Sequence, residues 1–217
     1  MDHVELYRIV EDAMREEELG AKEIPAIDLY MDQILSLVSE KSKAGSERYH
    51  DRPLTKTMIN NYSKDGLITP VKGKKYNSEQ IMQILTIYTL KNSLSIGEIK
   101  RLLQGAYGIE GFDGADLTAL YDRHLAIKQG NRDDAKEALT HLLEKHQLNV
   151  EDERDYLLTI CGLLSLSGFL HETARAMLDA KYPLTDDEPE KEKEKEKDKD
   201  KDKEKKKKKK SEHNDAE

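Results

Sequence analysis

Residues 54–76, LTKTMINNYSKDGLITPVKGKKY, combine a helix, a turn and a cluster of lysines in one short stretch. Thr55 suits the N-cap of a helix, because its hydroxyl can accept a hydrogen bond from a free amide of the first turn. Gly66 suits the left-handed backbone that often follows the last turn. The sequence therefore predicts a helix over about 55–65, then an extended stretch, a tight glycine turn and a return strand ending at Tyr76.

The two faces of this predicted helix differ in character. Met58, Ile59 and Tyr62 share one stripe, which we expect to face the core. The opposite face would present polar side chains to solvent, namely Lys56, Thr57, Asn60, Asn61 and Lys64.

This polar pattern is typical of a helix that reads duplex DNA. Asparagine can pair bidentately with adenine, and lysine suits guanine or phosphate. The lysines of the predicted hairpin, Lys72, Lys74 and Lys75, would contact phosphates and so position the helix without reading sequence. We count Thr55 with these residues as a candidate DNA contact, whereas Tyr62 and Tyr76 are expected to support the core. Arg48 and Arg52 could act as further phosphate clamps.

The distribution of charge singles out the same region. The chain carries 36 bases and 44 acids, a formal net charge of −8. Residues 46–105 nevertheless hold ten bases and five acids, a net charge of +5, while residues 1–45 and 106–185 each sum to −6. A basic island in an acidic chain indicates a polyanionic partner, either a nucleic acid or an acidic protein.

Hydrophobic periodicity predicts helices on both sides of the island. Residues 43–53 are expected to form a loop. The predicted helices are 4–19, closed by Gly20; 28–42, with Asp28 as N-cap; 78–92, capped by Asn77 or Ser78; and 96–104, opened by a capping box from Ser95 to Glu98.

The C-terminal half is predicted to be helical as well, with helices over about 116–129, 133–147 and 150–181. A break is expected at Gly130–Asn131. The apolar run from Leu157 to Leu170 has 14 residues, fewer than the roughly 20 that span a bilayer, so we expect a buried helix and no membrane partner. Either a partner subunit or the N-terminal helices could cover it.

These elements define the predicted organisation of the chain. The fold class is all-α, mainly helical, with a small β-hairpin wing. The predicted parts are an N-terminal helix (1–23), a winged helix-turn-helix head (24–104), a linker (105–114), a helical dimerisation or regulatory segment (115–185) and a Lys/Glu/Asp-rich tail (186–217), which lacks a core-forming composition and is expected to be disordered.

No pattern in the sequence predicts catalysis or a cofactor. Cys161 is the lone cysteine, which excludes an internal disulfide and a cysteine zinc cage and suits the cytoplasm; we expect it to be a small core residue. His141 and His146 are five residues apart, off a common helix face, so no metal site is predicted. The N-terminus lacks the features of a secretory signal. We therefore expect a cytoplasmic protein that is not an enzyme.

The residues quoted above also resemble known regulators. Leu54–Thr55, Met58–Tyr62, Gly66–Ile68, the basic wing and the later LSIGEIKRLL resemble the head of MerR-type regulators. Over residues 24–104, from IDLYMDQIL to LKNSLSIGEIKRLL, the chain is similar to an uncharacterised bacterial family known only as a domain of unknown function, whose members are presumed transcription factors.

The MerR resemblance implies a homodimer, a recognition helix in the major groove, a wing on the neighbouring backbone and a helical dimerisation segment after the head. The chain departs from that pattern at Asn60 and Asn61, which replace the usual arginine and aromatic residue, in its shorter wing and in its longer loop over 43–53. No effector domain is recognisable after the head. The prediction is a DNA-binding transcriptional regulator; the alternative is a protein-interaction adaptor that docks an acidic partner on the same scaffold.

Overall fold

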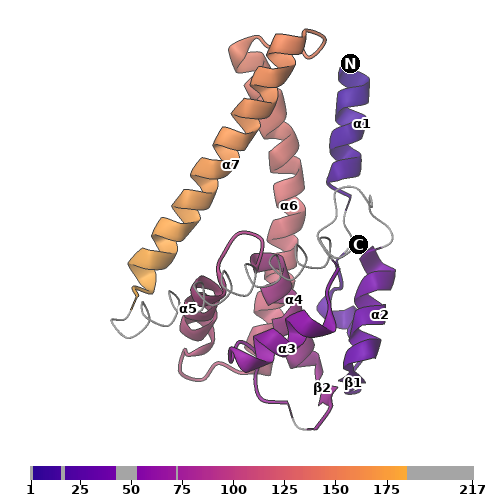
Figure 1. Cartoon of the computed structure of the whole chain (residues 1–217), viewed down its shortest axis with the longest axis vertical. Helices are drawn as coiled ribbons and strands as arrows, with labels where there is room; N and C mark the ends of the chain where they lie inside the picture. The colour runs from indigo at the N-terminus through magenta and orange to yellow at the C-terminus, as the bar shows by residue number, and fades with distance from the viewer. Residues whose placement is uncertain (1, 16–17, 43–52, 72, 185–217) are drawn as a thin grey trace, which may run out of the picture. The chain divides into compact units, whose positions relative to one another are not determined.

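The computed structural model describes residues 2–15, 18–42, 53–71 and 73–184. Within these ranges the chain is mainly helical and contains one two-stranded antiparallel sheet (Figure 1). This confirms the predicted fold class. The elements in chain order are α1 (His3–Ala13), η1 (Ala21–Glu23), β1 (Leu29–Tyr30), α2 (Met31–Ser42), α3 (Lys56–Lys64), β2 (Lys75–Tyr76), α4 (Ser78–Leu90), α5 (Ile96–Tyr107), α6 (Gly114–His146) and α7 (Glu153–Lys181).

Helix α3 forms as its end signals predict. The Thr55 hydroxyl accepts a hydrogen bond from the Met58 amide at 3.3 Å. At the other end Gly66 has a φ of +69°, and the Leu67 amide donates to the Tyr62 carbonyl at 2.9 Å. These bonds satisfy backbone groups that the helix leaves free at its ends.

The strand that pairs with β2 is not the predicted one. Tyr76 lies opposite Leu29, and Lys75 lies opposite Tyr30, so β2 pairs with β1 and not with residues 67–70. The cause lies in two buried glutamines of α4, Gln80 and Gln83, which take the hydrogen-bonding groups of Thr69 and Pro70. Proline also has no amide hydrogen to give to a ladder. The wing is therefore not a hairpin, and we call its described residues, 67–71 and 73–76 including β2, the wing loop.

Several predicted boundaries are wrong for local reasons. Helix α1 ends at Ala13 and not near Gly20. Leu19 lies beyond the end of the helix because it is buried in a core that it forms with later residues, from Ile24 to Tyr121. Helix α2 begins at Met31 and not after Asp28, because Leu29 and Tyr30 form the strand β1.

Helix α6 runs without a break from Gly114 to His146, so the predicted interruption at Gly130–Asn131 is wrong. One glycine costs a helix only about 1 kcal/mol. The N-terminus is firmly capped, since Asp113 Oδ1 accepts from the amides of Ala115 at 2.8 Å and Asp116 at 3.0 Å.

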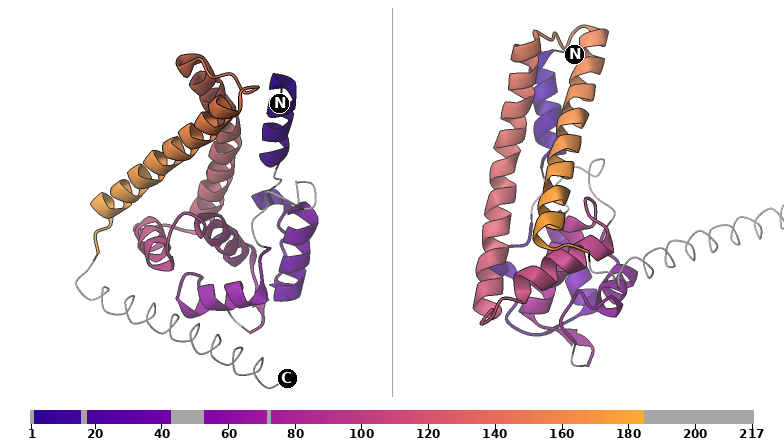
Figure 2. Two further views of the ribbon diagram at one scale, coloured as in Figure 1. Left: turned by 45° about the horizontal axis from the view of Figure 1, so that its top comes forward. Right: turned by 90° about the vertical axis from the view of Figure 1, so that its left-hand side faces the viewer.

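Two clusters of apolar side chains hold the described chain together. The larger surrounds α4, and six isoleucines in it are fully buried: Ile34, Ile59, Ile81, Ile84, Ile87 and Ile99. It includes Leu19 and Tyr121, whose hydroxyl donates to the Leu19 carbonyl at 2.7 Å. The smaller cluster joins α1, α6 and the residues just before α7 through Leu6, Leu139, Leu143 and Val150, and Tyr156 and Leu163 of α7 pack against it. Figure 2 shows these helices side by side.

Helix α7 is exposed over most of its apolar length, so the expected buried helix is wrong for the described chain. Seven large apolar side chains between Leu157 and Leu170 are exposed. By length and composition α7 could cross a membrane. Cys161 is exposed and is not the core residue that was expected. The chain divides into two compact units, and the boundary falls inside α7 after Ala174.

Candidate nucleic-acid interface

The predicted reading face of α3 is exposed. Its five polar residues, Lys56, Thr57, Asn60, Asn61 and Lys64, all lie on the surface, whereas Ile59 and Tyr62 are buried on the opposite side. The side chains of Asn60 and Asn61 make no hydrogen bond to any other residue that the structure describes. Their amide groups are therefore available to an external donor or acceptor.

The start of α2 joins α3 to the wing loop. Lys56 of α3 forms an ion pair with Asp32, in the first turn of α2. The ammonium group of Lys75 lies 5.0 Å from the ring centroid of Tyr30, a cation–π arrangement. Tyr30 and Asp32 are only two residues apart, so Lys56 and Lys75 flank the same short segment and belong to one surface.

The remaining predicted contacts fall into two groups. Lys64 in the last turn of α3 and Lys74 in the wing loop are exposed and form no ion pair with another described residue. Thr55 is exposed, and its hydroxyl oxygen caps α3, which leaves its proton free to donate. Lys72, Arg48 and Arg52 lie outside the described residues.

The glutamines of α4 fix the wing loop against the helical core. Gln80 Nε2 donates to the carbonyls of Thr69 and Pro70, both at 3.1 Å, and its Oε1 accepts from the Asn77 amide at 3.0 Å. Gln83 Oε1 accepts from the Thr69 amide at 2.9 Å. Both glutamines are only 5% exposed, so these bonds are shielded from water and hold the loop in one place.

Two tyrosines support the surface from below, as predicted. Tyr76 is buried opposite Leu29 in the sheet, and Tyr62 is buried under α3. The Tyr62 hydroxyl has no hydrogen-bond partner in the described part of the chain. Burial raises the pKa of Tyr62 to about 12.

Sequence reasoning missed Tyr30 and Asp32 as members of this surface. The helix predicted over 28–42 included Tyr30, but the strand β1 turns Leu29 inward and Tyr30 outward, to 5% and 50% exposure. The alternation of a buried leucine with a tyrosine directly before the helix was the available signal.

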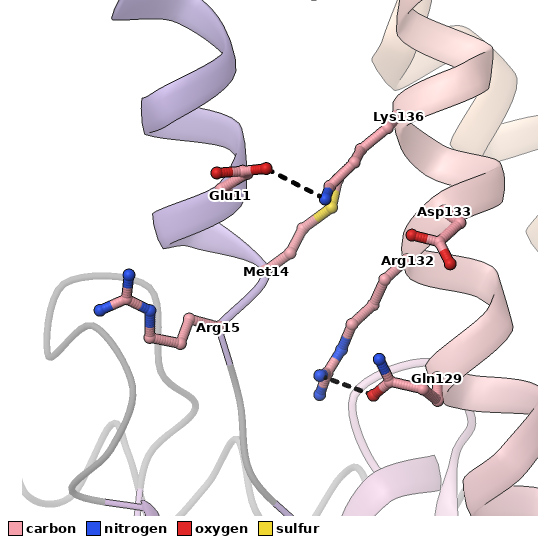
Figure 3. A pocket seen from close by; sticks show the side chains of 7 residues that line it. All are labelled: Glu11, Met14, Arg15, Gln129, Arg132, Asp133 and Lys136. Carbon is pink, nitrogen blue, oxygen red and sulfur yellow. Dashed lines mark hydrogen bonds and ion pairs between the residues drawn. The ribbon is translucent and has the colours of Figure 1, made fainter.

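A separate cavity lies between α1 and α6 (Figure 3). It has a volume of about 270 Å³ and is lined by three basic and two acidic side chains together with Met14 and Gln129. Lys136 Nζ lies 3.3 Å from Glu11 Oε1, and Arg132 donates to Gln129 Oε1 at 2.8 Å. Opposite charges thus pair within the cavity, and none of the predicted DNA contacts lines it.

The described residues contain no group of histidine, cysteine, aspartate and glutamate side chains that could hold a metal ion. His141 and His146 are both exposed on α6.

Comparison with known proteins identifies one domain. Residues 19–124 match the family described as domain of unknown function (DUF1836). This range includes the exposed face of α3 and the wing loop, together with Leu19 and Tyr121 of the larger core. No curated protein and no solved structure matches the chain.

Proposed function

We propose that the chain is a DNA-binding transcriptional regulator whose residues 24–104 act as a MerR-like winged helix-turn-helix head. In this proposal α3 enters the major groove and the wing loop contacts the neighbouring phosphates. The observation that carries it is the pairing of an exposed amide-and-lysine face on α3 with the exposed Lys74 and Lys75 of the wing loop. No enzymatic activity and no cofactor are part of the proposal.

The chemistry of the surface divides the work between two sets of residues. Asn60 and Asn61 project from consecutive positions of one helix, and each can form two hydrogen bonds to the edge of a base. Lys64, Lys74 and Lys75 offer charge without directional preference, which suits phosphate. The amides would therefore set sequence preference and the lysines would set affinity.

Lys56 differs from Lys64, Lys74 and Lys75 because its ammonium group is already paired with the carboxylate of Asp32. A phosphate that approaches Lys56 must compete with the carboxylate of Asp32. Lys56 is therefore expected to add less to affinity than Lys74.

A protein-interaction adaptor is the second candidate, and one observation favours it. Tyr30 is 50% exposed and its ring lies against Lys75, and an exposed apolar group beside a lysine suits a protein groove better than a duplex. The exposed side of α3 itself is polar throughout, which favours DNA.

Fluorescence anisotropy on the full-length chain tests the proposal. The probes are labelled duplexes from the region upstream of its own operon and a scrambled duplex of equal composition. Asn60→Ala with Asn61→Ala should abolish the preference for the natural duplex, while Asn131→Ala, an exposed asparagine of α6, should leave it unchanged. Equal binding of both duplexes by the unaltered chain would refute sequence-specific recognition.

Substitution of single lysines tests separately which residues contribute to the affinity for DNA. Lys74→Ala should weaken binding to both duplexes alike, and Lys145→Ala, an exposed lysine near the end of α6, is the matched control. If Lys74→Ala and Lys145→Ala weaken binding equally, the wing loop has no part in it. Binding of an acidic protein by the same surface, with no binding to duplex, would favour the adaptor.

A further inference from the structure

The charged cavity between α1 and α6 lies between two points at which the N-terminal residues are fixed to α6. At one point the hydroxyl groups of Tyr7 and Thr140 are hydrogen-bonded at 2.6 Å. At the other the Tyr121 hydroxyl donates to the Leu19 carbonyl at 2.7 Å. The volume of about 270 Å³ between them is therefore held open by walls that are anchored on both sides (Figure 3).

One stripe of α6 changes from apolar to polar where it lines this cavity. Its two apolar ends pack in the larger and the smaller cluster. The stripe, at spacings of three and four residues, consists of Tyr121, Leu125, Gln129, Arg132, Lys136, Leu139 and Leu143. Continuous packing against α1 would favour apolar side chains at the three middle positions. Two cations and an amide stand there instead, which suits the binding of a polar ligand.

The charges of the cavity are arranged in two sets. Arg132 and Lys136 are half-buried, lie one turn apart and extend from α6 toward α1 (Figure 3). Two such donors on one turn suit a single carboxylate. The acids are Asp133, which forms no ion pair with another described residue, and Glu11, whose pair with Lys136 at 3.3 Å is largely exposed and therefore weak.

We propose that this cavity binds a free α-amino acid as its zwitterion. Arg132 and Lys136 hold the carboxylate, and Asp133 with Glu11 holds the ammonium group, while Met14 contacts the side chain. This inference does not depend on the proposed function. Both walls of the cavity also lie outside residues 19–124, so the matched domain does not supply the site.

Charge and size both favour this class of ligand. A simple anion would be repelled by Asp133, and a simple cation would be repelled by Arg132 and Lys136. A water molecule occupies about 30 Å³, so the volume suits a ligand of about ten non-hydrogen atoms. The third base, Arg15, is exposed and points away from α6 in Figure 3, so it adds positive charge at the rim. An amino acid with an acidic side chain should therefore bind more tightly than one with a basic side chain.

Isothermal titration calorimetry on the full-length chain at constant ionic strength tests the site, with L-glutamate as the probe. L-glutamate should bind with a dissociation constant below about 1 mM. Glutarate, which lacks the ammonium group, and L-lysine, which carries the opposite net charge, should bind at least about tenfold more weakly. Absence of L-glutamate binding, or equal binding of either comparison ligand, would overturn the proposal.

Substitutions on α6 test which groups hold the two charges. Arg132→Gln should weaken L-glutamate binding at least about tenfold, whereas Arg123→Gln, at an exposed arginine of the same helix, should leave it unchanged. Asp133→Asn should reduce the preference for L-glutamate over glutarate, which a purely structural role of Asp133 would not change. Unchanged circular dichroism spectra verify the fold. Equal binding by Arg132→Gln and Arg123→Gln, or an unaltered preference in Asp133→Asn, would overturn the assignment.

Discussion

Gln80 is the side chain on which the position of the wing loop depends most. It makes three hydrogen bonds to backbone groups of Thr69, Pro70 and Asn77. Gln80→Leu fills a similar volume but leaves these groups unpaired in a buried place, so the free energy of unfolding should fall by about 2–4 kcal/mol. Urea denaturation measures the loss. Gln104→Leu, at an exposed glutamine of α5, should change stability by less than about 0.5 kcal/mol; equal losses in both variants would contradict the account.

Tyr62 should lower the free energy of unfolding in two ways: through its unpartnered buried hydroxyl at neutral pH, and through the raised pKa of that hydroxyl at alkaline pH. Its buried hydroxyl has no hydrogen-bond partner among the described residues, so Tyr62→Phe should raise the free energy of unfolding at pH 7 by about 1 kcal/mol. Its pKa is about 12 in the folded chain, against about 10 when unfolded. The unfolded chain therefore loses this proton first as the pH rises.

The stabilisation linked to this proton is complete below about pH 10 and is lost as the pH rises through about 12. Tyr62→Phe should make the loss of stability over this range shallower. Denaturant titrations at successive alkaline pH values measure it, with Tyr30→Phe, at an exposed tyrosine, as the control. Identical pH profiles for Tyr62→Phe and the unaltered chain would be inconsistent with burial of this hydroxyl.

Asp32 should weaken DNA binding because its carboxylate forms an ion pair with Lys56 and competes with phosphate for that lysine. Asp32→Asn removes the carboxylate and releases the lysine. Affinity for duplex DNA should rise by up to about fivefold, the equivalent of about 1 kcal/mol, which is the upper range for an exposed ion pair. Anisotropy measures the change, and in a Lys56→Ala background the Asp32→Asn gain should be smaller. A fall in affinity on Asp32→Asn would show that Lys56 is not a DNA contact.

At the scale of elements, two glycines in the α6–α7 hairpin should respond oppositely to alanine. Gly130 has no neighbour within 4 Å of an added Cβ, so Gly130→Ala should stabilise the chain by about 1 kcal/mol through helix propensity. Gly162 gains the same propensity, but its Cβ would press on Leu142 at 2.9 Å, so Gly162→Ala should gain less or destabilise. Thermal unfolding compares the two. A larger gain at Gly162 would mean that α6 and α7 do not approach closely there.

Elements with strong local signals could be predicted from the sequence. Thr55 and Gly66 mark the ends of α3, and Ser95 with Glu98 marks the start of α5; in each case the side-chain bond that the signal implies is present. The buried stripe of α3 followed from the spacing of Ile59 and Tyr62. These features depend on residues within a few positions of one another.

The failures concern contacts that are distant in sequence. Residues 75–76 pair with residues 29–30, and nothing within the wing loop indicates that partner. The ion pair of Lys56 with Asp32 depends on the same docking of α2, so its effect on the interface was also missed. Cys161 was expected in a core because it lies in an apolar stripe, but the hairpin opens and leaves that stripe exposed.

At the scale of the whole molecule, the proposed function predicts a steep dependence on salt. The chain has a net charge of −8, so attraction to DNA must come from its local basic region. Each lysine that neutralises a phosphate adds about 0.9 to the slope of log affinity against log salt concentration. Lys64→Ala and Lys74→Ala should each reduce that slope by about 1 per protomer. Slopes equal to that of the unaltered chain would place these lysines away from phosphate.

The central claim is that the exposed amides of α3 read sequence in duplex DNA. Its most direct test is genome-wide occupancy of the tagged full-length chain, compared with the Asn60→Ala, Asn61→Ala variant. The account predicts discrete sites that share a sequence motif in the unaltered chain and the loss of that motif in the variant. Occupancy without a shared motif, or the same motif in both, would contradict it.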